Sequence, residues 1–167
     1  HVAALVAIEE RLVPALGELR DALAGKSREL AGVVKVGRTH LMEAAPLTLG
    51  QELSGFVAQL EHGLVHLERT AEGLRELAIG GTAVGTGLNA HPEFGRRVAA
   101  RLSELAGTRF REAENHFEAQ SARDAAVRTS GALKALAVSL IKIADDLRWL
   151  GSGPRHGLAE LELPPVQ

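Results

Sequence analysis

The chain has 167 residues, of which 46% are hydrophobic and 24% are charged, and it contains no cysteine. The apolar content excludes an intrinsically disordered chain, and the missing thiols exclude disulfides, thiolate metal sites, iron–sulfur clusters and a cysteine nucleophile. The net charge of -2 offers no basic field for nucleic acid, and the sequence has no uncharged apolar run long enough to predict a membrane span.

The first predicted element is a long helix over residues 2–30. Two rows of leucines repeat every seven residues, as expected for one face of a helix. The rows are Leu5, Leu12 and Leu19, and Leu16, Leu23 and Leu30. Pro14 lies inside this helix and predicts a bend or a local break, because proline has no backbone N–H to donate.

The second predicted helix covers residues 46–79 and begins at Pro46, a residue suited to a first helical turn. Heptad spacing runs along its whole length and indicates a seam that packs against other helices. One row is Leu49, Phe56, Gly63, Thr70 and Leu77, and the other is Leu53, Leu60, Leu67 and Leu74. Gly80 and Gly81 end the helix, as glycine does at helix C-termini.

Two further helices are predicted over residues 92–106 and 119–150, and no segment shows convincing strand alternation. The predicted fold class is therefore all-α, a bundle of long helices. The helix over 46–79 would be roughly 50 Å long at about 1.5 Å per residue. A compact domain of this size has a radius of gyration of about 15 Å. Other copies of the chain would have to cover the seams, which predicts a homo-oligomer.

Three connections between the helices are candidates for chemistry, because function concentrates in such segments. They are residues 37–40, 80–89 and 114–118. In the first, His40 could give or take a proton near neutral pH, and the Thr39 hydroxyl could bind a carboxylate oxygen. On residue types alone, a loop histidine that bonds the backbone is the favoured interpretation of His40.

Other motifs favour structural interpretations. The glycine run 80–89 follows no predicted strand, so it is not a dinucleotide fingerprint, and no lysine follows it as in a Walker loop. His62 and His66 stand four apart on a helix but lack a third ligand, so we expect no metal site. Charged residues alternate in sign along the helix 92–106, which predicts solvated charge at Arg96, Arg97 and Arg101 rather than an anion site.

Several segments together resemble class II fumarase (fumarate hydratase), in the fumarase/aspartase superfamily. The resemblance covers nearly the whole chain. The matching segments are Val36–Leu41, Ala45–Glu52, Gly80–Asn89, His91–Phe94, Asn115–Ala119, Gly131–Lys134, Ile143–Leu150 and Ser152–Arg155.

The resemblance implies a fold and an assembly. Members of the family are homotetramers whose subunits contribute long helices to a twenty-helix core. Residues 1–167 would be the central helical domain, without the N-terminal and C-terminal domains of the complete enzyme. We accordingly expect this sequence to be an internal piece of a longer protein.

The resemblance also implies a reaction, the reversible hydration of fumarate to L-malate, with a small dicarboxylate substrate, no cofactor and a cytoplasmic location. In the family, the His of the Thr-His pair donates and accepts a proton on the water side, and the Thr binds substrate. These residues are His40 and Thr39 here. The Ser-Ser-Asn segment and the Gly-Ser-Ser loop of the family are absent, so the piece alone is expected to be inactive.

Two alternatives remain open. Aspartases share the Gly-Arg-Thr and Gly-Thr-Gly-Leu-Asn segments, although they tend to carry Gln where His40 stands, and the tail Leu161–Gln167 resembles aspartases as much as some fumarases. His116 and His156 also depart from the residues common in fumarases. An aspartase-like ammonia-lyase is therefore one alternative, and a catalytically inactive, self-assembling helical fragment is the other.

Overall fold

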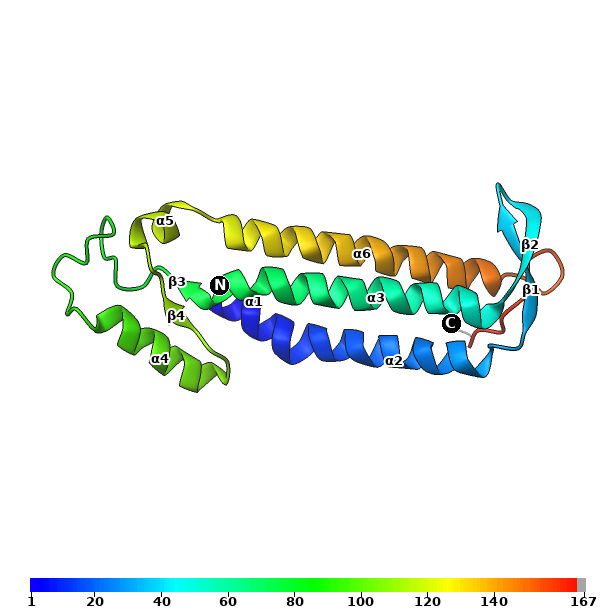
Figure 1. Ribbon diagram of the computed structural model, residues 1–167, viewed down its shortest axis with the longest axis horizontal. Helices are drawn as coiled ribbons and strands as arrows, with labels where there is room; N and C mark the ends of the chain where they lie inside the picture. The colour runs from blue at the N-terminus through cyan, green and yellow to red at the C-terminus, as the bar shows by residue number, and fades with distance from the viewer. Residues whose placement is uncertain (165–167) are drawn as a thin grey trace.

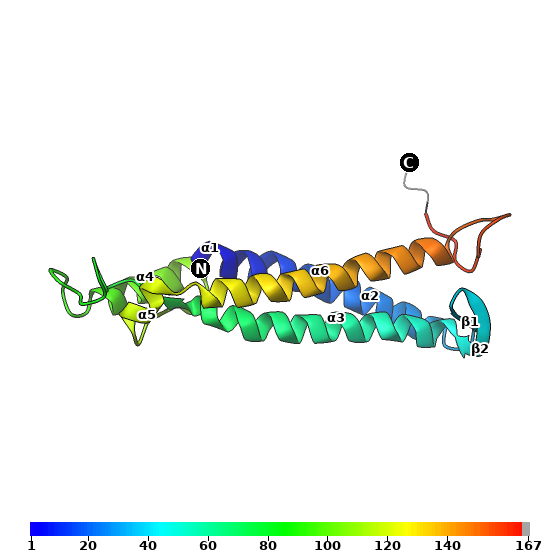
Figure 2. The ribbon, with the colours of Figure 1, turned by 90° about the horizontal axis from the view of Figure 1, so that it is seen from above.

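The computed structural model describes residues 1–164, in which three long helical segments lie side by side as a rod (Figures 1 and 2). Along the chain they are α1 (Val2–Ala7), which continues through a π-helical turn (Ile8–Leu12) into α2 (Val13–Glu29), then α3 (Leu49–Ala71) and α6 (Asp124–Leu150). In Figure 1, α3 lies between α2 and α6. The helical body confirms the all-α fold class, while residues 165–167 of the predicted domain lie outside the described part.

The irregularity predicted from Pro14 is found in the turn before it. The helix does not break, because α2 carries the proline in its first turn. The preceding five residues, Ile8–Leu12, form the π-helical turn. Proline has no N–H for the carbonyl four residues back, and a π turn is a common way to rearrange hydrogen bonds within a continuous helix.

The core follows the face of α3 that heptad spacing predicted. Leu60 and Leu67 have no exposed surface, and the other leucines of both rows are buried as well. Because α3 has α2 on one side and α6 on the other, both rows face apolar neighbours. Those neighbours include Leu5, Leu16 and Leu23 from the first segment and Ala132, Leu136 and Ile143 from α6.

The prediction that the chain has no strands was wrong, as was the helix start at Pro46. Two strands, β1 (Val34–Thr39) and β2 (Met42–Thr48), form an antiparallel hairpin that contains Pro46. The helix begins after Thr48, where a capping box replaces the missing helical bonds: Gln51 N donates to Thr48 Oγ1 (3.1 Å), and Thr48 N donates to Gln51 Oε1 (2.9 Å). A two-stranded ribbon tolerates Pro46 because each strand has one unpaired edge.

The far end of the rod also differs from the predicted helices 46–79 and 119–150. The α3 helix gives way to a 3-10 turn (Glu72–Arg75) and to β3 (Glu76–Leu77), which pairs in parallel with β4 (Arg111–Glu112). Helix α5 (His116–Ser121) is separate from α6. The Arg123 guanidinium donates to the carbonyl oxygens of Gln120 and Ala122 (3.0 and 2.6 Å), which helps to end α5. Helix α4 (Phe94–Ala106) ends at the left-handed Gly107.

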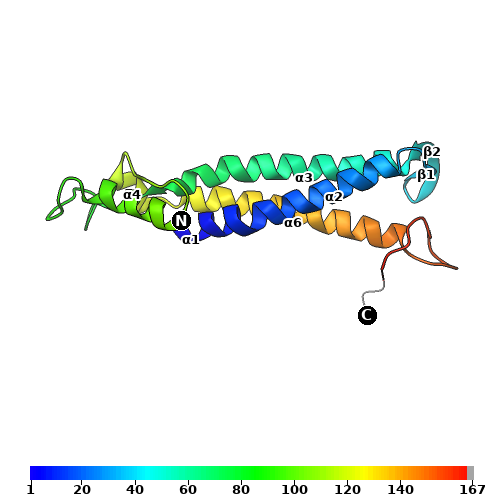
Figure 3. The same cartoon turned by 90° about the horizontal axis from the view of Figure 1, so that it is seen from below.

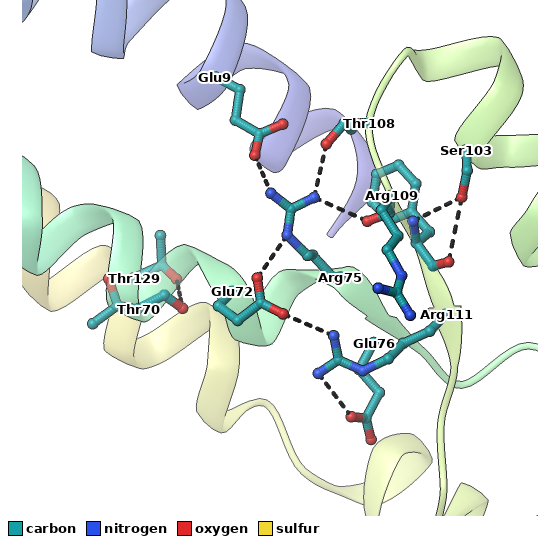
Figure 4. Close-up of polar contacts among 11 residues, drawn as sticks. Glu9, Thr70, Glu72, Arg75, Glu76, Ser103, Thr108, Arg109, Arg111 and Thr129 are labelled. Atoms are coloured by element: carbon teal, nitrogen blue, oxygen red, sulfur yellow. Dashed lines mark hydrogen bonds and ion pairs between the residues drawn. The ribbon is translucent and has the colours of Figure 1, made fainter.

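A polar network surrounds the 3-10 turn in which α3 ends (Figure 4). Arg75 pairs with Glu9 from the π turn and with Glu72, and it donates to Thr108 Oγ1 (2.7 Å). Arg111 of β4 donates to the second oxygen of Glu72 (2.9 Å). This hydrogen bond lowers the pKa of Glu72 below its ordinary value, although burial opposes it. The network ties two distant segments of the chain, the π turn and residues 108–111, to one turn.

Candidate functional site

Thr39 and His40 lie at the tip of the β1–β2 hairpin, at one end of the rod (Figure 1). Thr39 pairs with Met42, so His40 and Leu41 form a two-residue turn. Both have left-handed backbones, with φ of 53° and 62°, as a type I′ turn requires. Such turns favour Asn and Gly, and a left-handed residue with a side chain costs roughly 1–2 kcal/mol. Strain of this kind concentrates at functional sites.

The side chains of this turn face solvent. Thr39 and His40 are exposed, and Leu41 and Met42 keep 92% and 71% of their surface accessible. The hydroxyl and the imidazole are therefore open to a ligand, while the two exposed apolar residues offer surface to another molecule. The hairpin presents the predicted pair of residues but does not enclose a pocket around them.

Four charged side chains connect β1 of the hairpin to α3 and to the segment after α6. Lys35 of β1 forms ion pairs with Glu52, in the first turn of α3, and with Glu160 (2.6 Å), in the segment after α6. Arg38 pairs with the other oxygen of Glu160 (2.8 Å). The side chains of Lys35 and Glu160 are only 9% and 17% exposed. This ion cluster (Lys35, Arg38, Glu52 and Glu160) was missed by sequence reasoning because no local pattern connects its members.

The ion cluster shifts the pKa values of Lys35 and Glu160 in opposite directions. Burial alone would lower the pKa of Lys35, but the neighbouring carboxylates of Glu160 and Glu52 outweigh it and raise that pKa above its ordinary value. Burial alone would raise the pKa of Glu160, but Lys35 and Arg38 outweigh it and lower that pKa. Both shifts favour the charged forms of Lys35 and Glu160.

The glycine run 80–89 lies at the opposite end of the rod (Figures 1 and 3). Gly80, Gly85 and Gly87 all have positive φ, between 72° and 105°. A Cβ on Gly85 would come within 2.8 Å of the Phe117 ring. The run is therefore a set of tight turns at close approach, as predicted, with glycine required both by conformation and by space.

The third predicted connection, 114–118, packs against this glycine run. His116 Nε2 lies 3.1 Å from the Ile79 carbonyl oxygen and 3.2 Å from Glu112 Oε1. Gln120 Nε2 donates to the Thr82 carbonyl oxygen (2.8 Å). The structure thus brings the second and third connections together and leaves Thr39 and His40 at the other end of α3.

The remaining candidates have ordinary roles. Arg97 pairs with Glu93 and Arg101 with Glu104 (2.5 and 2.7 Å), as the alternation of charge predicted. His62 and His66 lie on the exposed face of α3. In the described part of the chain, no group of three or more His, Asp or Glu side chains is arranged to hold a metal ion.

A hollow of about 660 Å³ lies beyond the end of α6, at the hairpin end of the rod. Trp149 and the loop Ser152–Leu158 line it.

Among the helices of residues 1–164, none combines the length and the apolar run that crossing a membrane requires.

Comparisons with known proteins agree on one family. A protein-family model described as lyase matches residues 1–167. Class II fumarate hydratase of Nitrosomonas europaea is 59% identical over 164 residues, or 98% of this chain and 36% of that protein. The enzyme of the same name from Myxococcus xanthus is 60% identical over 163 residues, or 98% of this chain and 35% of that protein.

Solved structures show the same similarity. A cobalt-bound crystal structure of fumarate lyase:delta crystallin from Brucella melitensis has a TM-score of 0.92 at 43% identity, covering 99% of this chain and 36% of that one. Recombinant class II fumarase from Schistosoma mansoni has a TM-score of 0.94 at 33% identity, covering 99% and 38%. This chain therefore spans little more than a third of the length of the proteins that it matches.

Proposed function

The chain belongs to the lyase family whose model matches it from residue 1 to residue 167, and on this premise we propose that it serves the reversible hydration of fumarate to L-malate. The observation that carries the proposal is the hairpin tip, where a strained left-handed turn exposes His40 beside Thr39. A cytoplasmic location is part of the same proposal and rests on the resemblance alone.

The proposed chemistry assigns one role to each of these side chains. The His40 imidazole gives a proton to the departing hydroxyl of L-malate, and in the reverse direction it takes a proton from the attacking water. The Thr39 hydroxyl donates a hydrogen bond to a substrate carboxylate. A base removes the C3 proton of L-malate, and the negative charge that gathers on the adjacent carboxylate needs cationic and hydrogen-bonding groups. We assign this base and these groups to parts of a longer protein. The proposed reaction uses no cofactor.

The separation of the candidate segments supports a site shared between copies. The 23 residues of α3 span about 34 Å at 1.5 Å per residue, with the Thr39–His40 turn at one end and the glycine run at the other. A four-carbon dicarboxylate cannot bridge that distance. Antiparallel copies would bring the two ends together, which supports a homo-oligomer, and we propose a homotetramer from the resemblance to class II fumarase.

A second apolar stripe on α6 supports this self-association. Val138 and Ile141 are 59% and 61% exposed, and Val127 and Trp149 are 67% exposed each. With Lys134 and Asp145, these residues recur at spacings of 3, 4 or 7 and so share one helix face. A helix that is apolar on opposite faces is typically buried on both.

The stripe is self-complementary when α6 is paired with an antiparallel copy of itself. If Val138 faces Ile141 of a second copy, the same register sets Lys134 opposite Asp145 of that copy, on both sides of a two-fold axis. Light scattering tests this pairing. Lys134→Glu alone removes two symmetric ion pairs between the copies. If these pairs together contribute about 1.4 kcal/mol, the dissociation constant should rise about tenfold. Adding Asp145→Lys should restore the wild-type value, and a clean monomer in the wild type would refute the pairing.

The reaction is tested on the full-length protein by following fumarate loss in water and then with ammonia. Formation of malate without ammonia supports the hydratase. Consumption that requires ammonia would instead favour the aspartase-like alternative. His40→Asn is expected to reduce hydration by roughly 10²–10⁴-fold, whereas the control His62→Asn, on the exposed face of α3, should leave it unchanged. Equal activity in both variants would exclude His40 from the chemistry.

Experiments on the isolated segment 1–167 test the remaining alternative, an inactive helical fragment that assembles with itself. We expect it to assemble without hydrating fumarate, as a self-associating helical module. Turnover by this segment alone would refute the proposal that further parts of a longer protein complete the site.

A further inference from the structure

Two cations of β1 share one carboxylate beside the proposed catalytic turn and next to a β-bulge. Strand side chains alternate, so Lys35 and Arg38, three residues apart, would normally lie on opposite faces of β1. The pairing register shifts between Gly37 and Arg38, because β2 carries one extra residue, Ala44, at this step, and a bulge increases the local twist of the two strands. Both cations nevertheless reach one carboxylate, that of Glu160.

Backbone hydrogen bonds fix the segment after α6 at the position that carries Glu160. Glu160 N and Leu161 N both donate to the Leu150 carbonyl oxygen (2.9 and 3.1 Å), and Ala159 N donates to that of Ser152 (2.7 Å). Ala159 has a left-handed backbone with φ of 49°, a conformation that costs roughly 1–2 kcal/mol for a residue with a Cβ. The end of α6 therefore holds Glu160 at a defined position, despite a strained turn.

The two carboxylates of the ion cluster have different roles. Glu52 contacts Lys35, whereas Glu160 contacts both Lys35 and Arg38. Within residues 1–164, Arg38 makes this ion pair and no other. Arg38 directly precedes Thr39, so Glu160 is the group that links the end of α6 to the strand end carrying the turn.

We propose that Glu160 is a positioning residue that holds the Thr39–His40 turn in its working orientation through Arg38. This inference rests on the proposed function of His40. Removal of the Glu160 charge frees Arg38 at the end of β1, while Lys35 keeps Glu52. The turn can then move relative to the substrate, and a displacement of about 1 Å at a reacting group can reduce the rate by up to about a hundredfold.

The test compares Glu160→Gln with Glu52→Gln in the full-length protein. Each variant removes one carboxylate charge from Lys35, but only the first releases Arg38. We expect Glu160→Gln to lower the kcat of the folded protein about tenfold to a hundredfold, and Glu52→Gln to change kcat less than about threefold. Glu160→Asp, which keeps the charge, is expected to recover most of the lost kcat.

Hydrogen exchange of the peptide covering residues 34–48 supplies a readout that does not depend on turnover. Its amides should exchange faster in Glu160→Gln than in Glu52→Gln, with equal exchange in the α3 peptide. Equal kcat in the two variants, or a kcat loss matched by lost folded protein, would overturn the inference. If the wild type does not hydrate fumarate, the proposed function fails, and the exchange comparison still decides whether Glu160 holds the hairpin.

Discussion

Gly50 offers a direct test of the packing between α2 and α3, because two physical effects predict opposite signs for Gly50→Ala. Alanine is the better helix former by about 1 kcal/mol, so local propensity predicts stabilisation. In the structure, a Cβ at residue 50 would lie 2.4 Å from the Ser27 carbonyl oxygen and 2.7 Å from the Ala31 Cα. Both are backbone atoms, one in the last turn of α2 and one just after it, and neither can rotate away.

The steric effect is the larger of the two. A carbon–oxygen contact of 2.4 Å must lengthen by about 1 Å to reach normal separation, which means moving one helix end away from the other. That movement strains the hydrogen bonds from Gly50 N to the Leu30 carbonyl oxygen (3.1 Å) and from Ser27 Oγ to the Gly50 carbonyl oxygen (2.7 Å). Overpacking of this kind costs about 1–3 kcal/mol, so we expect net destabilisation.

The matched control is Gly55→Ala in the same helix, where a Cβ would meet nothing within 4 Å. It should stabilise the chain by up to about 1 kcal/mol. Urea denaturation of the wild type and both variants at one protein concentration measures the difference in free energy of unfolding. If Gly50→Ala stabilised the chain as much as Gly55→Ala, the close contact of α2 with α3 would be refuted.

Three further predictions concern the core, the start of α3 and the ion cluster. Leu67→Ala should destabilise by about 3 kcal/mol because Leu67 is fully buried, whereas Val65→Ala on the exposed side should stay within about 0.5 kcal/mol in urea melts. Thr48→Ala removes the acceptor for Gln51 N and should lower the thermal midpoint by an amount equivalent to about 1 kcal/mol; an unchanged midpoint would contradict the capping box. Since the pKa of Glu160 is lowered from 4.5, its stabilisation is present above that pH and disappears on acidification. The stability difference between wild type and Glu160→Gln should therefore shrink below about pH 4.5, and a difference independent of pH would contradict this ion pairing.

The spacing of residues along the sequence was sufficient to predict the features that depend only on near neighbours in the chain. The seven-residue spacing of Leu53, Leu60 and Leu67 identified the face that the structure buries, because side chains at that spacing lie on one side of a helix whatever covers them. Pro14 correctly indicated an irregular helical turn for an equally local reason.

Local signals failed where two local preferences competed. Pro46 is compatible with a first helical turn and with an edge strand, and heptad spacing continued past it. Only the pairing of β2 with β1 and the capping box at Thr48 decided that the helix begins at Leu49. The glycine run and the motif around His40 were both recognised as connections, but their separation to opposite ends of the rod follows from the length of α3 between them.

The sequence by itself determined the helical class, the buried seam and the identity of Thr39 and His40 as candidates, because each depends on neighbours a few residues away. The tertiary structure alone decided how that pair is held. Lys35 and Glu160 are 125 residues apart along the chain, and Arg38 pairs with the same carboxylate. An ion pair across such a distance forms only after the helices have packed, and no periodicity in the sequence encodes it.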